Sequence, residues 1–169
     1  MSDPDWVSKL GLEIHPEGGY FKRIYTAATN HATAAGERPL ATSIYYLLDR
    51  TEPRGRLHRN RSDILHFFLD GGPVEYLMLT ADGELRRERL GNGPGDSRFL
   101  LVSGGCWKAS QLIGGASHAL VAEVVTPGFD YADHQFAREE DLRREYPQHL
   151  EALRPLWPKM TMLSPGLSG

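Results

Sequence analysis

The chain is poor in the features that mark secreted, membrane-spanning or nucleic-acid-binding proteins. Cys106 is its single cysteine, so no internal disulfide can form and no oxidising compartment is needed. The formal net charge is only −3, which leaves no strong field to recruit nucleic acid or an anionic membrane. No apolar run reaches the roughly 18 residues of a spanning helix, and no apolar segment of a secretory signal follows the acidic start Met1–Asp5. We therefore expect a cytoplasmic protein without a nucleic-acid or membrane partner.

Arginine is locally abundant, but acidic residues are interleaved with it. The arginines in question are Arg54, Arg56, Arg59, Arg61, Arg86, Arg87 and Arg89, and Glu52, Asp63, Glu84 and Glu88 lie among them. This mixture is typical of a solvated charged face and not of a nucleic-acid-binding surface.

Short apolar runs are separated by turns about every ten residues along most of the chain. The eighteen glycines and eleven prolines supply these turns, and the Asp82-Gly83 pair is typical of a hairpin. Runs rich in β-formers predict strands at 20–26, 42–48, 64–69, 74–80, 84–90, 98–103, 107–113 and 118–126. This spacing is typical of an all-β sandwich or closed barrel.

Helix signals occur only near the two ends. Asp5 can cap a short helix that Gly11 ends, and the charged segment 137–146 predicts a second helix, stopped by Pro147. The polar, alanine-rich stretch 27–38 predicts a loop.

No internal repeat or linker divides the sequence. We expect one domain over residues 1–158 and a flexible tail over residues 159–169.

Five segments keep an order and a spacing that resemble a known family. They are His15–Phe21, Thr42–Leu48, His58–Arg59 with Ser62–Asp63, Pro127–Asp133 and Tyr146–His149. Together they resemble the cupin-5 family of RmlC-like cupins, long catalogued as a domain of unknown function, over roughly residues 7 to 153. The resemblance implies a double-stranded β-helix, a jelly roll closed into a barrel, with a pocket for a small molecule and a homodimeric assembly. It does not imply one reaction, because related barrels include epimerases, isomerases, lyases, metal-dependent oxygenases and binding proteins.

The metal-binding residues of many cupins are largely missing here. Such cupins hold a divalent metal with two histidines, a glutamate and a later histidine, and His58 stands at the first histidine position of the family pattern. The following strand usually reads Glu-Ile-Trp-His-Phe-His, but here it reads Ile64–Leu69 with neither the glutamate nor the final histidine. We therefore expect no metal; if one is bound, the remaining donors are His58, Asp63 and His66.

The orientation of His66 depends on how this strand is aligned with the family. Without a gap, His66 shares strand parity with Ile64 and faces the pocket, whereas a one-residue deletion turns it to the other face. We favour the ungapped alignment because Gly71, Pro73 and Glu75 then stay in register.

Four residues are candidates for catalysis: His58, His66, Tyr45 and Glu123. A histidine suits proton transfer because its usual pKa lies near neutral pH, although a turn histidine bonded to backbone or a satisfied buried histidine is the alternative. Tyr45 can protonate a carbanion or simply pack in the barrel wall. Glu123 lies in an apolar strand, where a carboxyl group has either a partner or a raised pKa.

Six further residues are candidates for ligand binding: Glu17, Tyr20, Arg23, Ser43, Lys108 and Asp130. Tyr20 and Arg23 are three positions apart, so on one strand they face opposite sides unless a bulge intervenes. Lys108 replaces an aromatic residue of the family and can supply a cation or an amine, or lie exposed at an edge. For Asp130 and Asp133 we favour a structural role, closing a loop and capping the final helix.

These observations favour a small-molecule enzyme that works by metal-independent acid–base chemistry. The expected reaction is an epimerisation, isomerisation or elimination on a polar, sugar-like or carbonyl-containing metabolite. Two alternatives stay open: a non-catalytic small-molecule-binding cupin, and a metal-dependent cupin oxygenase or lyase.

Overall fold

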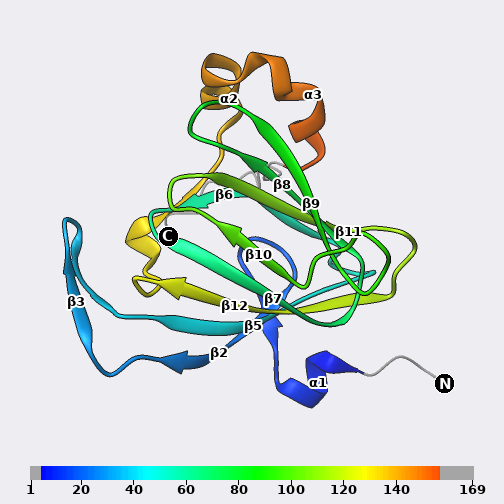
Figure 1. Ribbon diagram of the computed structural model, residues 1–169, viewed down its shortest axis with the longest axis horizontal. Coiled ribbons are helices and arrows are strands. Elements are labelled where there is room, and N and C mark those ends of the chain that lie inside the picture. The colour runs from blue at the N-terminus through cyan, green and yellow to red at the C-terminus, as the bar shows by residue number, and fades with distance from the viewer. Residues whose placement is uncertain (1–4, 157–169) are drawn as a thin grey trace, which may run out of the picture.

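Two antiparallel sheets face each other and enclose the interior of a barrel in the structure, a computed structural model that describes residues 5–156 (Figure 1). The six-stranded sheet has the order β1 (Glu13–Ile14), β2 (Tyr20–Thr26), β5 (Thr42–Asp49), β12 (His118–Thr126), β7 (Asp63–Gly71) and β10 (Phe99–Val102). The five-stranded sheet has the order β13 (His134–Phe136), β6 (Arg54–Asn60), β11 (Trp107–Leu112), β8 (Val74–Leu79) and β9 (Leu85–Leu90). This arrangement is the predicted jelly roll. The tail expected over residues 159–169 lies outside the described residues.

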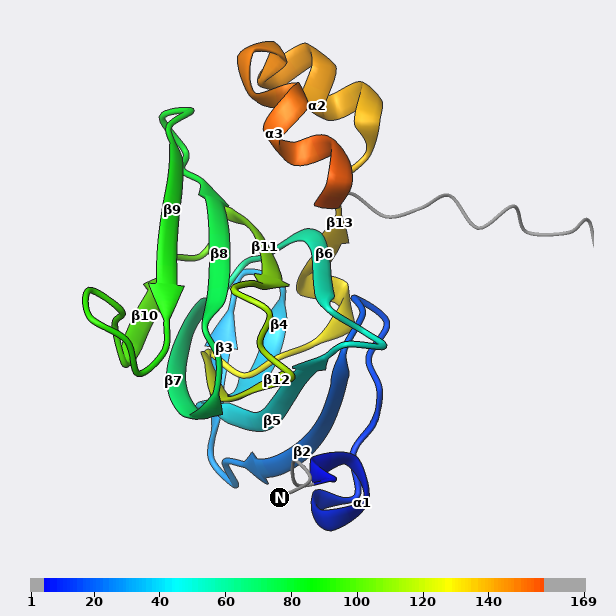
Figure 2. The same cartoon turned by 90° about the vertical axis from the view of Figure 1, so that its right-hand side faces the viewer.

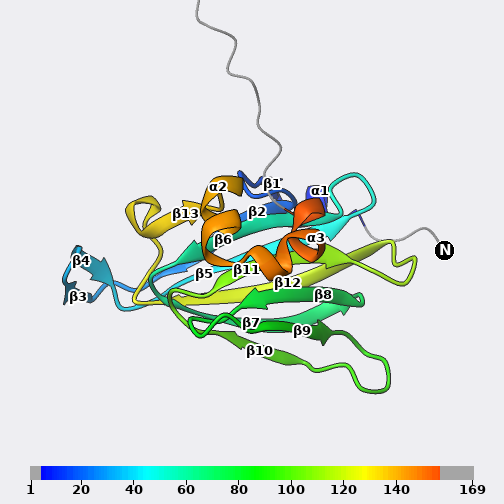
Figure 3. The ribbon, with the colours of Figure 1, turned by 90° about the horizontal axis from the view of Figure 1, so that it is seen from above.

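The remaining elements lie outside the two sheets. A separate hairpin of β3 (Asn30–Thr33) and β4 (Gly36–Pro39) projects from one end of the barrel (Figures 1 and 3). Helix α1 (Trp6–Leu10) lies on the opposite side of the barrel from α2 (Glu139–Glu145) and α3 (Leu150–Leu153), as Figure 2 makes plain. Three 3₁₀ turns complete the described chain: η1 (Tyr131–Asp133), η2 (Pro147–His149) and η3 (Arg154–Leu156).

Alternating burial along the strands explains why these sequences pair face to face. In β7, the side chains of Ile64, His66 and Phe68 are buried in the barrel, whereas Phe67 and Leu69, which alternate with them, are exposed on the outer face. This is the inward orientation that the ungapped alignment predicts for His66. A core of buried apolar residues from both sheets fills the barrel, and a second cluster fills the space beneath α2 and α3.

Part of the strand prediction is wrong because local polarity hid several strands. The predicted loop 27–38 contains the β3–β4 hairpin, and strands β6 and β13 were not predicted at all. Leu57 is the single aliphatic residue of β6, so this strand offers no apolar alternation to recognise.

The end helices follow the predicted capping chemistry at the N-terminus but not at the C-terminus. The Asp5 side chain accepts a hydrogen bond from the Ser8 amide, and Gly11 ends α1 in the left-handed region. Asp130 caps η1 and not the helix α2, whose first residue is preceded by Arg138 without a side-chain cap. Within residues 5–156, no helix is long and apolar enough to cross a bilayer.

Candidate functional site

A cavity of about 180 Å³ lies against the inner face of the six-stranded sheet. Its walls are apolar and aromatic, and its polar groups come from the loop before β2, from β2, β5, β6 and β12, and from η1. The lining residues are His15, Glu17, Phe21, Arg23, Thr42, Ile44, His58, Asn60, Ile64, Glu123, Val125, Phe129 and Tyr131. A concave, mainly apolar space with a few convergent polar groups is the usual form of a small-molecule site.

Glu17 reaches the cavity because the following two glycines let its loop pass close to β6. A Cβ at Gly18 would overlap the carbonyl oxygen of Arg54, and Gly18 has φ 93°, a conformation that favours glycine. The amide of Arg56 donates to the Glu17 carbonyl at 2.7 Å, which ties the loop to β6. The Glu17 side chain is thereby buried beside His58.

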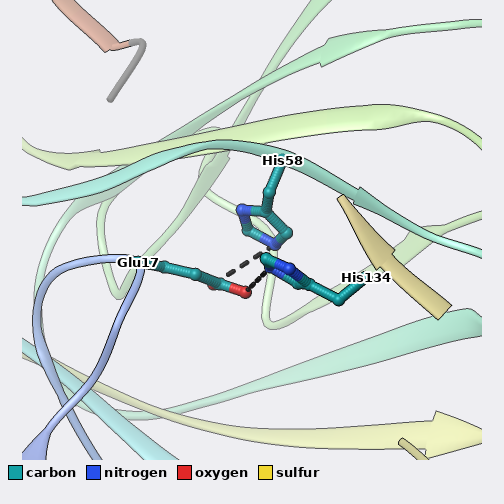
Figure 4. A group of neighbouring side chains, drawn as sticks. All are labelled: Glu17, His58 and His134. Carbon is teal, nitrogen blue, oxygen red and sulfur yellow. Dashed lines mark hydrogen bonds and ion pairs between the residues drawn. The ribbon is translucent and has the colours of Figure 1, made fainter. Parts of the chain in front are cut away.

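His58 projects from β6 with its tautomer set by the backbone. Its Nδ1 lies 2.7 Å from the carbonyl oxygen of Arg56, which can only accept, so Nδ1 carries a proton. The other ring nitrogen, Nε2, lies 3.2 Å from Glu17 Oε2 (Figure 4).

His134 completes a group that we call the histidine cluster: Glu17, His58 and His134. His134 is the first residue of β13, and its Nε2 lies 2.8 Å from Glu17 Oε1. Its ring stacks on that of His58, with centroids 5.2 Å apart. Both imidazoles therefore face the same carboxylate from the same side (Figure 4).

The cluster places an ionised carboxylate beside the lone pair of a neutral imidazole. Burial lowers the pKa of His58 to about 4, so the imidazole is neutral near pH 7 and its Nε2 holds a lone pair. Burial works to raise the pKa of Glu17, but the charge that His58 takes up in acid, the hydrogen bond from His134 and the nearby His15 and Lys108 hold that pKa well below its usual range. An ionised carboxylate thus faces a nitrogen lone pair at 3.2 Å, and the pair attracts a positively charged species.

The same three residues could hold a metal ion. One ligand atom from each lies within 4.8 Å of the others, and two histidines with one carboxylate form a ligand set that suits Fe(II), Mn(II) or Zn(II). The hydrogen bond from His58 Nδ1 to a backbone carbonyl is the outer contact that ligating histidines commonly make.

The donor set expected from the sequence, His58 with Asp63 and His66, is not brought together. Asp63 begins β7 on the exposed side, and its carboxylate accepts from the Gly104 amide at 2.8 Å. His66 faces inward but its Nε2 contacts Lys108 at 2.9 Å. Strand parity separates Asp63 from His66 because they are three positions apart.

A second buried polar group, which we call the lysine cluster, consists of His66, Lys108 and Glu123. Lys108 Nζ lies 2.9 Å from His66 Nε2 and 3.6 Å from Glu123 Oε1. Glu123 lines the cavity, whereas the His66 side chain is fully buried. Burial raises the pKa of Glu123, and Lys108 opposes that rise. The two cavity carboxyls thus differ: Glu17 is ionised, whereas Glu123 holds a proton more readily.

Arg23 lines the cavity, whereas Tyr20 does not. Phe21 and Arg23 of β2 both line the cavity, and Tyr20 packs on the other face of the sheet against the cluster around Leu47. A bulge does occur in β2, between Arg23 and Tyr25 opposite β5, but it lies beyond Arg23. It therefore makes Arg23 the last cavity-facing residue of β2 and leaves Tyr20 outside.

Three other expected site residues also lie away from the cavity. Ser43 and Tyr45 alternate with Thr42 and Ile44 along β5, and the latter two line the cavity, so Ser43 and Tyr45 face outward. Tyr45 packs with the outer cluster that includes Leu47. Asp130 is exposed and accepts from the Ala132 amide at 2.8 Å, which is the structural role favoured for it.

The sequence reasoning missed His134 of the histidine cluster and several residues that line the cavity. His134, His15, Asn60, Phe129 and Tyr131 were not proposed as site residues. A signal for His134 exists, since it follows directly on the family segment that ends at Asp133. This signal could not be used without knowing that the segment returns to β6 beside His58.

A jelly roll with a histidine-lined cavity inside it defines the cupin class of protein. The model of the family described as Cupin superfamily (DUF985) matches residues 4–137, and the chain belongs to this family.

Relatives and solved structures agree with this assignment. The chain is 35% identical over 153 residues to an uncharacterised protein of Saccharomyces cerevisiae, YML079W, an alignment that spans 81% of this chain and 74% of the yeast protein. A hypothetical protein from Leishmania major superposes with a TM-score of 0.85 at 28% identity, covering 91% of this chain and 97% of that one. Protein SO0799 from Shewanella oneidensis gives a TM-score of 0.84 at 31% identity, covering 94% and 99%.

Similarity to better-known enzymes is limited to the fold. Oxalate decarboxylase from Bacillus subtilis superposes with a TM-score of 0.55 at 14% identity, covering 92% of this chain and 43% of that one. At this identity the likeness concerns the barrel alone.

Proposed function

We propose that this chain is an enzyme that moves protons on a small, polar, carbonyl-containing metabolite bound in the barrel cavity. The reaction class is epimerisation, isomerisation or elimination, carried out by residues of the chain itself. One observation carries the proposal: the cavity is lined by a neutral histidine, His58, and by a buried acid, Glu123, whose surroundings favour opposite proton-transfer roles.

In the proposed reaction, His58 acts as the base. Its Nε2 takes a proton from the carbon next to the substrate carbonyl, and the electron pair of the broken C–H bond becomes an enolate. The imidazolium that forms is stabilised by Glu17 Oε2 at 3.2 Å. His134 holds the other oxygen of Glu17 at 2.8 Å, so the carboxylate is already oriented before the proton moves.

Glu123 then gives its proton either to the enolate carbon, which completes an isomerisation, or to a leaving group, which completes an elimination. Arg23 is the cation of the cavity lining and is exposed, so it is suited to hold an anionic group of the substrate. Its guanidinium donates one hydrogen bond, to Thr26 Oγ1 at 3.3 Å, and has no acidic partner among the described residues.

Solvent exchange tests the proposal directly. The protein is incubated in D₂O with a panel of keto sugars and 2-keto acids, beginning with fructose and 2-ketobutyrate, and deuterium uptake at carbon is followed by mass spectrometry. We expect uptake into at least one class, reduced about 100-fold or more in His58→Gln and unchanged in Tyr45→Phe, whose side chain faces away from the cavity. Uptake that is equal in wild type and His58→Gln would exclude His58 as the base.

A second candidate function, a metal-dependent oxygenase or lyase, is favoured by the arrangement of the histidine cluster. Glu17, His58 and His134 would hold the ion, which would supply Lewis-acid or redox chemistry when bound. In that case the Arg56 carbonyl keeps the His58 lone pair directed at the ion, and Glu123 remains the proton donor.

Elemental analysis separates the two candidates. The protein is purified without added metal and its Mn, Fe, Ni and Zn contents are measured per chain. A content near one ion per chain that is lost in His134→Gln favours the metal-dependent function. Sub-stoichiometric metal together with solvent exchange favours the metal-free function, and a chain with neither property is a binding module.

We also propose that two copies of the chain pair through the outer face of β7 and β10. Phe67, Leu69, Phe99 and Leu101 are each 40–47% exposed there, and β10 is at the edge of the sheet. The strand register places Phe67 opposite Phe99, and their rings lie 5.4 Å apart, so the apolar surface is continuous. Sedimentation equilibrium should give a dimer that Leu101→Asp dissociates; a monomeric wild type would contradict the proposal.

We further propose a cytoplasmic location without a nucleic-acid partner. Cys106 is a free thiol, which suits a reducing compartment. The three arginines of β9, Arg86, Arg87 and Arg89, are each paired with an acidic side chain. Cell fractionation and a gel-shift assay with mixed DNA and RNA test the two parts separately.

A further inference from the structure

His66 is buried too deeply to meet a substrate. Its side chain is 0% exposed and it does not line the cavity. Its Nδ1 lies 3.2 Å from the carbonyl oxygen of Leu100, which can only accept, so Nδ1 carries the proton. The Nε2 atom is therefore a bare acceptor, and it faces Lys108 Nζ at 2.9 Å.

Lys108 carries its ammonium across the barrel, from the five-stranded sheet to the six-stranded one. It lies opposite His58 in the pairing of β11 with β6, whereas His66 lies opposite Glu123 in the pairing of β7 with β12. The ammonium thus sits against a cross-strand pair on the facing sheet, 3.6 Å from Glu123 Oε1.

His66 provides an acceptor for this ammonium without adding charge. Burial and the nearby Lys108 both lower the pKa of His66 well below its usual value, so the ring stays neutral. A flexible four-carbon side chain needs such an acceptor to hold one position, because the ammonium must otherwise satisfy its donors elsewhere. Only Lys108 N–H groups donate to the bare nitrogen among the described hydrogen bonds.

We infer that His66 is a positioning residue: its ring fixes the Lys108 ammonium beside Glu123, and this fixed charge allows the buried Glu123 carboxyl to release its proton during turnover. The inference rests on the proton-transfer function proposed above. It assigns His66 a role through Lys108, in place of the direct catalytic role expected from the sequence.

The neighbours of Glu123 support a decisive effect of this one cation. The charged or titratable groups that act on it from other elements are Lys108 of β11, Glu17 of the loop before β2, Tyr46 of β5, Tyr76 of β8 and His66 of β7. Glu17 adds negative charge, the tyrosines are buried and neutral, and His66 is neutral. Among these neighbours, Lys108 therefore supplies the positive charge that stabilises the ionised form of Glu123.

Carboxyl titration by NMR tests the inference without requiring a substrate. The protein is labelled with ¹³C at glutamate side chains, and the Glu123 signal is assigned by its loss in Glu123→Gln. We expect the midpoint of Glu123 to rise by about one pH unit or more in Lys108→Met, because the attraction of the ammonium for the carboxylate is gone. His66→Leu should raise it in the same direction.

His66→Gln is the matched control, because the glutamine oxygen keeps an acceptor for Lys108 without a ring. Its Glu123 midpoint should stay close to that of the wild type. A midpoint that is the same in His66→Leu and wild type, with near-UV circular dichroism showing that both are folded, would overturn the positioning role. If His66→Leu does not fold, an unchanged midpoint in Lys108→Met overturns it equally.

The outcome is separable from that of the proposed function. Absence of deuterium uptake in the wild type contradicts proton-transfer catalysis whatever the titration shows. Uptake with an unshifted Glu123 in the two variants contradicts only the inference about His66.

Discussion

The histidine cluster and the lysine cluster are both buried and both contain one carboxyl group, yet they are built and charged differently. In the histidine cluster, a loop and a short edge strand bring Glu17 and His134 to a single barrel residue, His58. All members of the lysine cluster are on central strands. The first joins an ionised carboxylate to the neutral His58 ring and to a hydrogen bond from His134, and the second joins a carboxyl of raised pKa to an ammonium.

This difference indicates that strands and loops contribute different properties to the site. Strand positions give the lysine cluster fixed geometry, which suits a proton donor that must be tuned by a nearby charge. The histidine cluster depends on chain segments that meet only after folding, and at the cavity it presents a carboxylate next to an imidazole nitrogen, a pair that attracts a proton or a cation. The two clusters share the cavity through His58, Glu17 and Glu123.

The largest expected effect is a loss of folding stability in acid, which we expect to come from the histidine cluster. The folded pKa of His58 is about 4, below the ordinary value of about 6.5, so the unfolded chain takes up the proton first as pH falls. The contribution of His58 to the free energy of unfolding should therefore be fully present above pH ~6.5. It should fall by about 3 kcal/mol as the pH approaches 4. Urea unfolding at several pH values measures the loss.

His58→Gln is the control for that experiment, because it cannot be protonated in the same window. Its stability should depend less steeply on pH between 6.5 and 4, with the remaining slope coming from groups such as His66 and His15, whose pKa values burial also lowers. Loss of Glu17 ionisation acts at lower pH. An identical slope in wild type and His58→Gln would mean that the pKa of His58 is not depressed.

A smaller effect should follow from removing the charge of Glu17. The carboxylate raises the pKa of His58 against the lowering by burial, so Glu17→Gln should lower this pKa further, by about one unit or ~1.4 kcal/mol. Titration of the His58 ring by ¹⁵N NMR measures the shift. Glu123→Gln, a change in the other cluster, should shift His58 less; the reverse order would contradict the separation of the two clusters.

The smallest effect is expected on the outer face of the sheet, which neither cluster reaches. Tyr45→Phe should change the free energy of unfolding by less than about 0.5 kcal/mol. Tyr46→Phe, one position along β5, should cost about 1 kcal/mol because it removes the hydrogen bond from the phenol to the Gly18 carbonyl. Denaturant titration of the pair tests the alternation; equal costs would contradict it.

The two clusters also differ in how far the sequence predicts them. His66, Lys108 and Glu123 were each singled out as unusual polar residues in strands, and strand parity together with the ungapped family alignment placed His66 inward. Parity also allowed Arg23 and Tyr20 to be separated, but it left open which of the two faces the cavity. Ser43 and Tyr45 are two positions apart and share one face of β5, but the sequence does not show whether that face is turned to the cavity.

The histidine cluster was harder to predict because its members are distant in sequence and lie on segments without periodicity. Glu17 and His58 were proposed separately, and nothing in their spacing relates either to His134. The barrel itself was predicted in most of its strands, because apolar alternation and glycine-rich turns are local properties. Strand β6, which carries His58, was not predicted because Leu57 is its single aliphatic residue.

The hydrogen bond from His58 to the Arg56 carbonyl has a consequence for how this site tolerates mutation. A main-chain oxygen is present whatever residue occupies position 56. A substitution of Arg56 therefore leaves the acceptor that sets the His58 tautomer in place. The Arg56 side chain is free to diverge while the proton stays on Nδ1. The orientation of the histidine therefore depends on the path of β6 and not on the side chain at position 56.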